Sequence, residues 1–326
     1  MKKAIILINF GTPEAATKEA VRSYLKEFLW DPRIVQIPRF IWWFILNFIV
    51  LKSRPEKSAK AYQRVWMDEG SPLKVFSEKI QHKLQLLADT KHPNQYDVIL
   101  AMRYGQPSIN SVIKQLDNQG YEQIIAFPLY PQQATSSTGT AWHAFQQAIR
   151  QLVKPVKNKL IPVYYEDTGY INALADSVRE HWLKNGNAGM LLISFHGVPE
   201  RTIKQGDPYL EHCTATAIAL ARSLGLNSEQ WQMVFQSRFG RGGWIKPYCN
   251  DVLQQLPNSG IKELDVICPG FAVDCLETLD EMAVENRDVF IAAGGQEYRY
   301  IPALNDSDKH IEVLLSLIES NSEIDG

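Results

Sequence analysis

Residues 191–200 read LLISFHGVPE and residues 6–14 read ILINFGTPE, so one pattern occurs at two distant places in the chain. Each copy is an apolar run followed by glycine and Pro-Glu, and the later copy carries one extra residue, His196, before its glycine. A short, nearly continuous apolar run that ends in a turn is typical of a strand buried on both faces. We therefore expect a buried strand at the start of each half of the chain.

Two further matches follow in the same order in each half. An Arg-aromatic-Gly triplet begins at Arg103 and again at Arg238, and a Pro-x-aromatic triplet begins at Pro128 and again at Pro269. Three matches in one order predict two similar lobes, because internal repeats report architecture. The length of 326 residues also suits two domains of roughly 150 residues each.

Short apolar runs alternate with amphipathic stretches along the whole chain, which is typical of parallel sheets in an α/β protein. We predict a first lobe over residues 1–158, a second lobe over residues 159–300 that carries His196 and Glu277, and a segment 301–326 that packs back on the first lobe. Such sheets bind ligands at the carboxyl ends of their strands, so a ligand cleft is expected between the lobes.

The first lobe carries extra residues. Its Pro-Glu and Arg-aromatic-Gly motifs are 90 positions apart, against 39 in the second lobe. The surplus, about 31–75, contains the apolar run Phe40 to Leu51, interrupted only by Asn47. Twelve helical residues rise about 18 Å, too little for a hydrocarbon core of about 30 Å. The run is therefore a buried core helix, an interfacial helix, or the lining of an apolar ligand site.

Composition and motifs exclude several classes of protein. The formal charge of -2, from 34 basic and 36 acidic residues, provides no field for nucleic acid. The four cysteines lack the spacing of a zinc site or a disulfide framework, so we expect free thiols and a cytoplasmic protein. The chain has no dinucleotide, P-loop or G-x-S-x-G motif, which disfavours nucleotide and serine-hydrolase chemistry.

His196 is the candidate acid-base residue, because it follows a predicted strand and precedes a Gly-Val-Pro turn. An imidazole with an ordinary pKa near 6.5 accepts and releases protons at neutral pH. A loop histidine whose ring is satisfied by the backbone is the alternative. The nearby turn Gly206-Asp207-Pro208-Tyr209 is expected to bracket the same loop.

Acidic residues form a second cluster of interest. Glu277, Glu281 and Glu285 recur every fourth residue, which puts them on one helix face, and Asp274 lies one turn earlier. Six acids and no Lys or Arg occur between residues 265 and 286. Such a line is either a solvated helix face or a set of oxygen ligands for a divalent metal. Aromatic residues at the repeat motifs, Phe10, Tyr104, Trp244 and Phe271, are either core or the walls of a ligand site, and Arg54, Arg103 and Arg238 supply cations.

These motifs together resemble one family. LLISFHGVPERTIKQGDPY, NFGTPE, EGSPL, MRYGQPS, LYPQQATSSTG, FQSRFGRGGW and CPGFAVDCLETLDE are similar to the signatures of ferrochelatases, most of all those of Gram-negative bacteria. The resemblance implies two Rossmann-like lobes without nucleotide and a porphyrin held between them. It also implies that the chain is an enzyme, a ferrochelatase that inserts Fe2+ into protoporphyrin IX at the last step of haem synthesis.

The resemblance implies a role for each matching residue. His196 matches the acceptor of pyrrole protons and iron ligand, Glu277 matches its partner, and Asp274 and Glu281 match an acidic metal path. Residues that match positions lining the macrocycle are Phe10, Arg103, Tyr104, Trp244 and Phe271. Residues that match the segment meeting the propionates or the pocket lip are Arg54, Tyr62 and Ser71.

The chain departs from parts of the family in two ways. Cys275 stands where many members have a histidine of the metal route. No cysteine follows Cys275, whereas a [2Fe-2S] cluster in other members is bound largely by C-terminal cysteines. We therefore predict no cluster and no other cofactor, with Fe2+ as a substrate.

Several alternatives remain open at this point. The chain could be a chelatase for another tetrapyrrole or metal, such as coproporphyrin III or cobalt, or a porphyrin- or haem-binding module without catalysis. We predict a monomer whose apolar run forms a lip that covers porphyrin and rests on the membrane surface, with Arg39 and Lys52 at the headgroup boundary.

Overall fold

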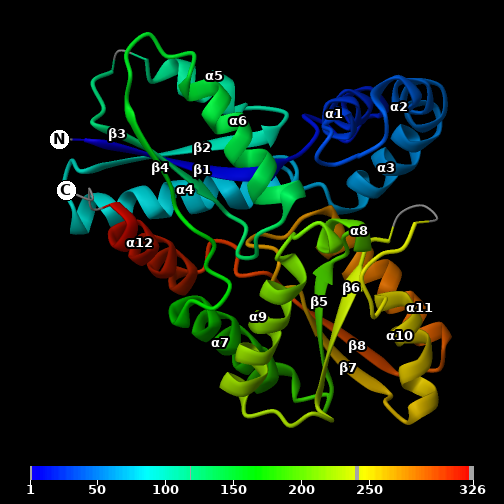
Figure 1. Ribbon diagram of the computed structural model, residues 1–326. Coiled ribbons are helices and arrows are strands. Elements are labelled where there is room, and N and C mark those ends of the chain that lie inside the picture. The colour runs from blue at the N-terminus through cyan, green and yellow to red at the C-terminus, as the bar shows by residue number, and fades with distance from the viewer. Residues whose placement is uncertain (1, 118, 239–241, 323–326) are drawn as a thin grey trace. The chain divides into compact units, whose positions relative to one another are not determined.

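The computed structural model describes residues 2–117, 119–238 and 242–322. The repeat residues Phe239 and Gly240 therefore lie outside the described part of the chain. The described residues divide into two compact units, and each unit contains a four-stranded parallel sheet with helices on its faces (Figure 1). The predicted α/β fold with two similar lobes is confirmed.

Unit 1 takes its residues from 1–129, 135–162 and 314–326. Its sheet has the order β2-β1-β3-β4, and all neighbours run parallel. The central strand β1 is fully buried from Ala4 to Ile8, as its unbroken apolar run requires. The strands are β1 (Lys3–Gly11), β2 (Tyr96–Tyr104), β3 (Gln123–Pro128) and β4 (Lys157–Leu160).

Helices cover both faces of this sheet. Figure 1 shows α4 on one face and α5 and α6 on the other, while α1, α2 and α3 group beyond the carboxyl end of β1. The helices of the unit are α1 (Lys18–Trp30), α2 (Arg39–Ile45), the π-helix η1 (Leu46–Val50), α3 (Leu51–Val65), α4 (Pro72–Lys91), α5 (Ile109–Gln115), the π-helix η2 (Thr135–Gly139) and α6 (Thr140–Ile149).

Gly11 fixes the carboxyl end of β1. Its φ is +110°, and a Cβ atom at this position would lie 1.8 Å from the carbonyl oxygen of Tyr104. No side chain fits there, so the close approach of β1 and β2 at this end requires glycine.

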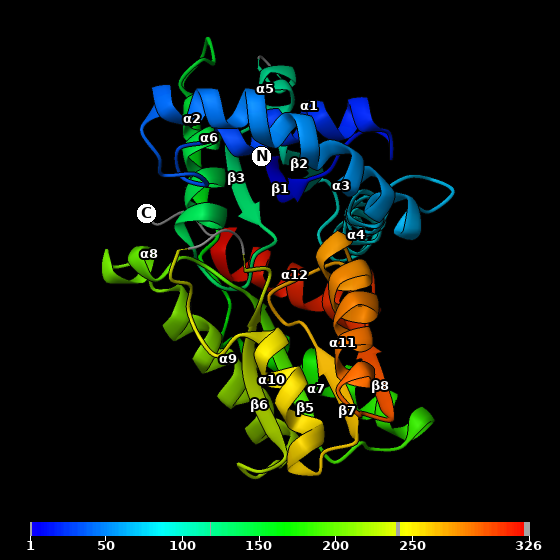
Figure 2. The same cartoon turned by 90° about the vertical axis from the view of Figure 1, so that its right-hand side faces the viewer.

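Unit 2 takes its residues from 130–134 and 163–313. Its sheet has the order β6-β5-β7-β8, which repeats the order in unit 1 strand for strand (Figure 2). The strands are β5 (Leu191–His196), β6 (Trp231–Gln236), β7 (Glu263–Ile267) and β8 (Glu297–Ile301). The helices are α7 (Thr168–Asn185), α8 (Glu200–Lys204), α9 (Tyr209–Leu224), α10 (Cys249–Gln255), the 3-10 helix η3 (Leu256–Ser259), the π-helix η4 (Glu277–Asn286) and α11 (Arg287–Ala292).

Asp265 on β7 connects three segments of unit 2 through buried hydrogen bonds. Its fully buried carboxylate accepts hydrogen bonds from Arg299 on β8 at 2.7 Å and from the indole N–H of Trp182 on α7 at 2.7 Å. The backbone N–H of Ala188 is a third donor at 3.1 Å. A buried carboxylate is tolerated because every bond to it is charge-assisted and it has a cationic partner.

The division of the chain differs in detail from the predicted boundaries. Residues 301–313 belong to unit 2, and α12 (Asp308–Ser322) runs from unit 2 into unit 1. Within unit 1, Glu319 on α12 lies 2.5 Å from the ring of His92, and Ser322 hydrogen-bonds the hydroxyl of Tyr96 at 2.7 Å. All four cysteines are buried free thiols, as predicted.

The apolar run 40–51 is helical, with one buried face and one exposed face. Trp42 is only 4% exposed and donates its indole N–H to the carbonyl of Leu29 at 2.7 Å. The opposite face is apolar and open to solvent, with Phe40 71% exposed and Ile49 62% exposed. We call this surface the lip face, and its residues are Phe40, Ile41, Trp43, Phe44, Phe48 and Ile49. The interpretation of this run as a fully buried core helix is therefore wrong. Within the described ranges, no helix combines the length and apolarity needed to cross a bilayer.

Candidate functional site

His196 is the last residue of β5, and its ring is held by its own turn. The Nδ1 atom lies 2.7 Å from the carbonyl oxygen of Gly197. A carbonyl oxygen can only accept, so Nδ1 must carry the hydrogen in this bond. The neutral ring then has its lone pair on Nε2, and this nitrogen is the one that can accept a proton.

Gly197 allows two other groups to approach this turn. Its N–H donates to the backbone carbonyl of Gln236 at 2.8 Å. A Cβ atom at Gly197 would lie 2.9 Å from that carbonyl oxygen and 3.2 Å from the indole of Trp244. Glycine is therefore needed for the Trp244 ring to lie against the backbone next to His196.

Paired backbone segments hold Trp244 in this place. The N–H of Ile245 donates to the carbonyl of Val198, and the N–H of Glu200 donates to the carbonyl of Gly243, both at 3.0 Å. Trp244 lies between the two bonded residues Gly243 and Ile245 in the chain, and it is half-buried. The predicted neighbours His196 and Trp244 are thus brought together within unit 2.

The turn before α9 supports the same strand end. Tyr209 is buried, and its hydroxyl and the Phe195 ring lie 3.9 and 3.4 Å from the place that a Cβ atom of Gly270 would occupy. Burial holds the pKa of Tyr209 well above its ordinary value, so the hydroxyl stays protonated. The side chain of Asp207 accepts from the N–H of Tyr209 at 3.1 Å and closes the turn. The N–H of Asp207 donates to the carbonyl of Thr202 at 3.1 Å, which joins this turn to the helix that follows the His196 loop.

Glu277 and Glu281 lie on η4, whose hydrogen bonds follow the wider π pattern and not the expected α pattern. Glu281 accepts from the N–H of Ser237 at 2.7 Å and from the Ser237 hydroxyl. Burial raises the pKa of the Glu281 carboxyl, the Ser237 bonds and the nearby His196 lower it, and the nearby Glu277 raises it, with a net increase. His196, Glu277 and Glu281 therefore interact electrostatically within one unit.

Gln236 connects these two parts of the site. Its side-chain amide donates to the carbonyl of Glu277 at 3.1 Å and accepts from the hydroxyl of Ser194 at 2.7 Å. Gln236 is 2% exposed, so each bond is made in a desolvated interior. The sequence reasoning missed Gln236 and Ser237. Their signal was the polar pair that directly follows the apolar run Met233 to Phe235.

The Asp274 carboxylate is buried and hydrogen-bonded by neighbouring side chains. Its carboxylate accepts from the hydroxyls of Tyr300 and Thr278 at 2.7 and 2.9 Å and from the amide of Asn305 at 2.7 Å. The residue is 3% exposed. These bonds join the loop before η4 to the segment after β8. A place for Asp274 on a metal path stays a prediction.

Arg103 and Tyr104 form a buried network at the carboxyl end of β2 in unit 1. The Arg103 guanidinium pairs with Asp31, and its Nε donates to the hydroxyl of Thr140 at 2.6 Å. The Tyr104 hydroxyl donates to Asp31 at 3.0 Å, and burial raises its pKa beyond the ordinary range. Tyr104 is 1% exposed and contacts the edge of Phe10 at a centroid distance of 5.2 Å. Asp31 and Thr140 are partners that sequence reasoning missed.

The remaining predicted residues have varied positions. Ser71 is buried and caps α4 by accepting from the N–H of Lys74 at 3.3 Å, and Tyr62 is buried on α3 against Trp66. Arg54 on α3 is half-buried. Phe271 in unit 2 is half-buried and packs on a core cluster. Their contacts with a porphyrin stay predictions.

The described residues contain no preformed metal cage. Among residues 2–117, 119–238 and 242–322, no three His, Cys, Asp or Glu side chains are grouped so that they could hold a metal ion. Glu277 and Glu281 offer oxygen donors and His196 a nitrogen donor, a mixture that suits a borderline divalent ion. Metal binding by His196, Glu277 and Glu281 stays a prediction.

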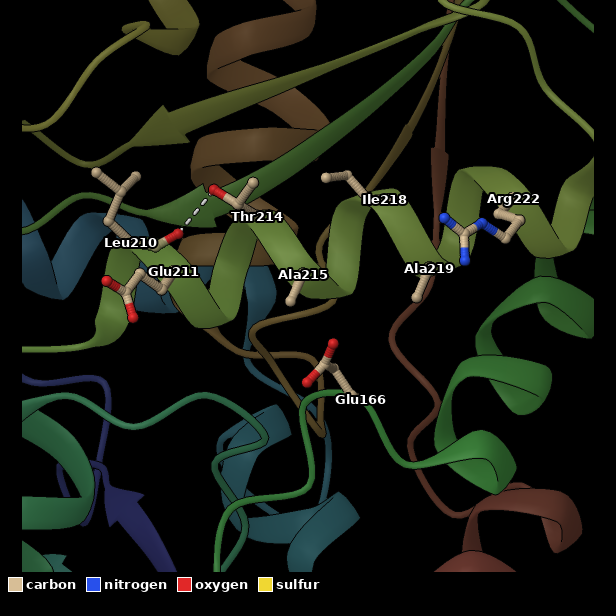
Figure 3. Close-up of a pocket in the computed structure, with 8 residues that line it drawn as sticks. All are labelled: Glu166, Leu210, Glu211, Thr214, Ala215, Ile218, Ala219 and Arg222. Carbon is tan, nitrogen blue, oxygen red and sulfur yellow. Dashed lines mark hydrogen bonds between the residues drawn. The ribbon is translucent and has the colours of Figure 1, made fainter.

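A hollow of about 500 Å³ lies elsewhere on unit 2, along α9. Figure 3 shows the Glu166 side chain pointing toward this helix beside Ala215 and Ala219. None of the predicted site residues lines it. Its lining residues are Glu166, Leu210, Glu211, Thr214, Ala215, Ile218, Ala219 and Arg222.

The sequence was compared with models of protein families and with known proteins. The sequence model of the ferrochelatase family matches residues 2–322. This chain belongs to the ferrochelatase family. The ferrochelatase of Methylococcus capsulatus is 46% identical over 98% of this chain and 96% of its own length. The ferrochelatase of Aeromonas hydrophila is 46% identical over 97% of this chain and 98% of its own length, and that of Nitrosococcus oceani is 46% identical over 97% of this chain and 86% of its own length.

Solved chelatase structures share the fold of this ferrochelatase-family chain. The sirohydrochlorin chelatase SirB from Bacillus subtilis, in complex with cobalt, superposes with a TM-score of 0.57 at 10% identity and covers 98% of this chain and 95% of its own. CbiX, the terminal enzyme of sirohaem biosynthesis in denitrifying bacteria, has a TM-score of 0.52 at 12% identity and covers 98% of this chain and 99% of its own. At such low identity these structures support the fold alone.

The bonds of Asp274 predict a structural effect of Asp274→Asn. The substitution turns one acceptor into a donor that faces Tyr300, Thr278 or Asn305, so we expect the free energy of unfolding to fall by about 2–3 kcal/mol in a urea titration. The KM for Fe2+ of the folded variant should stay within about twofold of the wild-type value. Asp288→Asn, at an exposed acid on α11, serves as the control. A variant of unchanged stability with a raised KM for Fe2+ would place Asp274 on the metal path.

Proposed function

We propose that this chain inserts Fe2+ into protoporphyrin IX and forms protohaem, the last step of haem biosynthesis. The observation that carries the proposal is the His196 ring in a chain of the ferrochelatase family. Its Nδ1 is committed to the carbonyl of Gly197, so Nε2 is left to accept protons near Glu277 and Glu281.

The reaction needs a proton acceptor more than it needs a nucleophile. Fe2+ replaces two pyrrole N–H protons, so the charge at the macrocycle centre is unchanged and both protons must leave. In the proposed mechanism the neutral Nε2 of His196 takes the first proton, releases it to solvent, and then takes the second. The resulting imidazolium is stabilised by the carboxylate of Glu281.

The carboxylates act on the metal. Glu277 and Glu281 replace part of the water shell of Fe2+ with oxygen donors, which exchange fast enough to release the ion to the porphyrin. The π-helix η4 places both carboxylates four residues apart on the same element. Trp244, packed against Gly197, provides an apolar wall next to His196 that suits a flat aromatic substrate.

The porphyrin proposed is protoporphyrin IX, on the strength of the family, and coproporphyrin III is the alternative substrate. Competition between purified porphyrins, and between Fe2+ and Co2+, in one assay separates these substrates and metals.

Removal of the imidazole tests the role of His196. In His196→Ala we expect kcat for Fe2+ insertion to fall by about a hundredfold or more, because general base catalysis contributes about 10²–10⁴-fold. Porphyrin binding, followed by fluorescence, should remain within a few-fold of wild type. Added imidazole should restore part of the activity, since it supplies the missing base.

The control for this variant is His82→Ala, at an exposed histidine of α4 in unit 1. Its turnover should match the wild type. Near-normal turnover of His196→Ala would remove His196 from the mechanism.

We also propose that the lip face rests on the cytoplasmic surface of a membrane. Six large apolar side chains are exposed on this helical segment, and large exposed apolar patches mark sites of contact with proteins or membranes. Lys52 is exposed beside them, with its ammonium 5.5 Å from the ring of Phe48, where it can reach lipid headgroups. The Arg39 guanidinium instead donates to the backbone carbonyls of Trp30, Val35 and Ile37, so it holds the preceding loop. The monomeric state stays a prediction.

Flotation with anionic vesicles tests this contact. The double variant Trp43→Ser/Phe48→Ser removes two exposed rings, and we expect its partition coefficient onto vesicles to fall by about tenfold or more. Leu183→Ser, at an 87% exposed residue of unit 2, is the matched control and should float like the wild type. Trp42 is left intact, because its buried ring anchors the helix. Equal flotation of all three proteins would contradict the membrane contact.

A further inference from the structure

Ser237 has an unusual backbone for its residue type. It follows the last residue of β6 and has a φ of +64°, in the left-handed region. For residues other than glycine this conformation costs roughly 1–2 kcal/mol. Glycine would adopt it without strain, so the serine side chain must contribute something at this position that glycine cannot.

That contribution is visible in the bonds of Glu281. The N–H of Ser237 donates to Oε1 at 2.7 Å and the hydroxyl donates to Oε2, so one residue binds both oxygens of the carboxylate. The left-handed backbone is what turns the N–H and the hydroxyl toward the same group. Hydrogen bonds to an ionised carboxylate are about twice as strong as neutral ones, which offsets the backbone strain.

The residue before Ser237 holds the same helix at a different point. The Gln236 side chain donates to the backbone carbonyl of Glu277 at 3.1 Å. Two successive residues at the end of β6 therefore bind η4 four residues apart, one through the backbone at Glu277 and one through the side chain of Glu281. Because the Gln236 carbonyl also accepts the N–H of Gly197 at 2.8 Å, this arrangement links the position of η4 to the turn that carries His196.

We propose that Ser237 is a positioning residue, which holds the Glu281 carboxylate in the orientation that delivers Fe2+ toward the porphyrin. This inference rests on the proposed ferrochelatase function. It assigns no contact with substrate to Ser237, which acts only through Glu281. A free Glu281 carboxylate would rotate away and bind the incoming metal less often in a productive orientation.

Ser237→Gly separates positioning from structural support. The variant keeps the backbone N–H, relieves the strain of the left-handed backbone and removes the hydroxymethyl side chain that binds Glu281. We expect its stability to equal or exceed that of the wild type in a urea titration, while kcat/KM for Fe2+ falls by about tenfold to a hundredfold. The KM for porphyrin should stay unchanged, which a general loss of structure would not allow.

The same measurement is made on Glu281→Gln and on the double variant. If Ser237 acts through Glu281, Glu281→Gln loses kcat/KM for Fe2+ at least as strongly, and Ser237→Gly adds nothing further to it. Asn94→Gly is the control for backbone strain, because Asn94 is an exposed residue of unit 1 with a φ of +59°. Its activity should equal that of the wild type.

Three results would overturn the positioning role. They are full Fe2+ insertion by Ser237→Gly, full insertion by Glu281→Gln, and additive losses in the double variant. Failure of the proposed function is seen separately, since wild-type protein would then insert no Fe2+ and His196→Ala would have nothing to lose.

Discussion

Gln236 is the residue on which the geometry of the second unit depends. Its backbone carbonyl accepts the N–H of Gly197, and its side-chain amide donates to the carbonyl of Glu277. One buried residue at the end of β6 thus sets the distance between the turn that carries His196 and the helix that carries both glutamates. Buried amides are costly when a partner is lost, by about 1–3 kcal/mol for each group, so this arrangement is rigid. A proton acceptor and two carboxylates gain a fixed geometry from it.

A backbone carbonyl also decides the chemistry of the ring. Because the Gly197 oxygen can only accept, the proton of neutral His196 must lie on Nδ1. The lone pair then lies on Nε2, the ring nitrogen that does not bond to the Gly197 carbonyl. Glycine is required at position 197 because a side chain there would come too close both to the backbone of β6 and to the ring of Trp244. The backbone geometry of this turn therefore determines which ring nitrogen of His196 can accept a proton.

The sequence was sufficient for the architecture. The repeat predicted two lobes because strand ends and turns use a small set of residues, and both sheets have the same strand order. His196 and Glu277 carry a motif that can be read locally. By contrast, the bonds of Glu281 to Ser237 and of Arg103 to Asp31 join residues 44 and 72 positions apart, which no local pattern reports. The π form of η4 was also missed, because acids at every fourth residue fit an α-helix equally well.

The central claim is that neutral His196 presents Nε2 as its proton acceptor, and its tautomer can be measured. Nitrogen-15 NMR of the protein labelled at histidine, with His196→Ala used to assign the signal, distinguishes a protonated ring nitrogen from a bare one. At a pH where the ring is neutral, the Nδ1 signal should be that of a protonated nitrogen and the Nε2 signal that of an unprotonated one. A proton on Nε2 with Nδ1 bare would contradict the account.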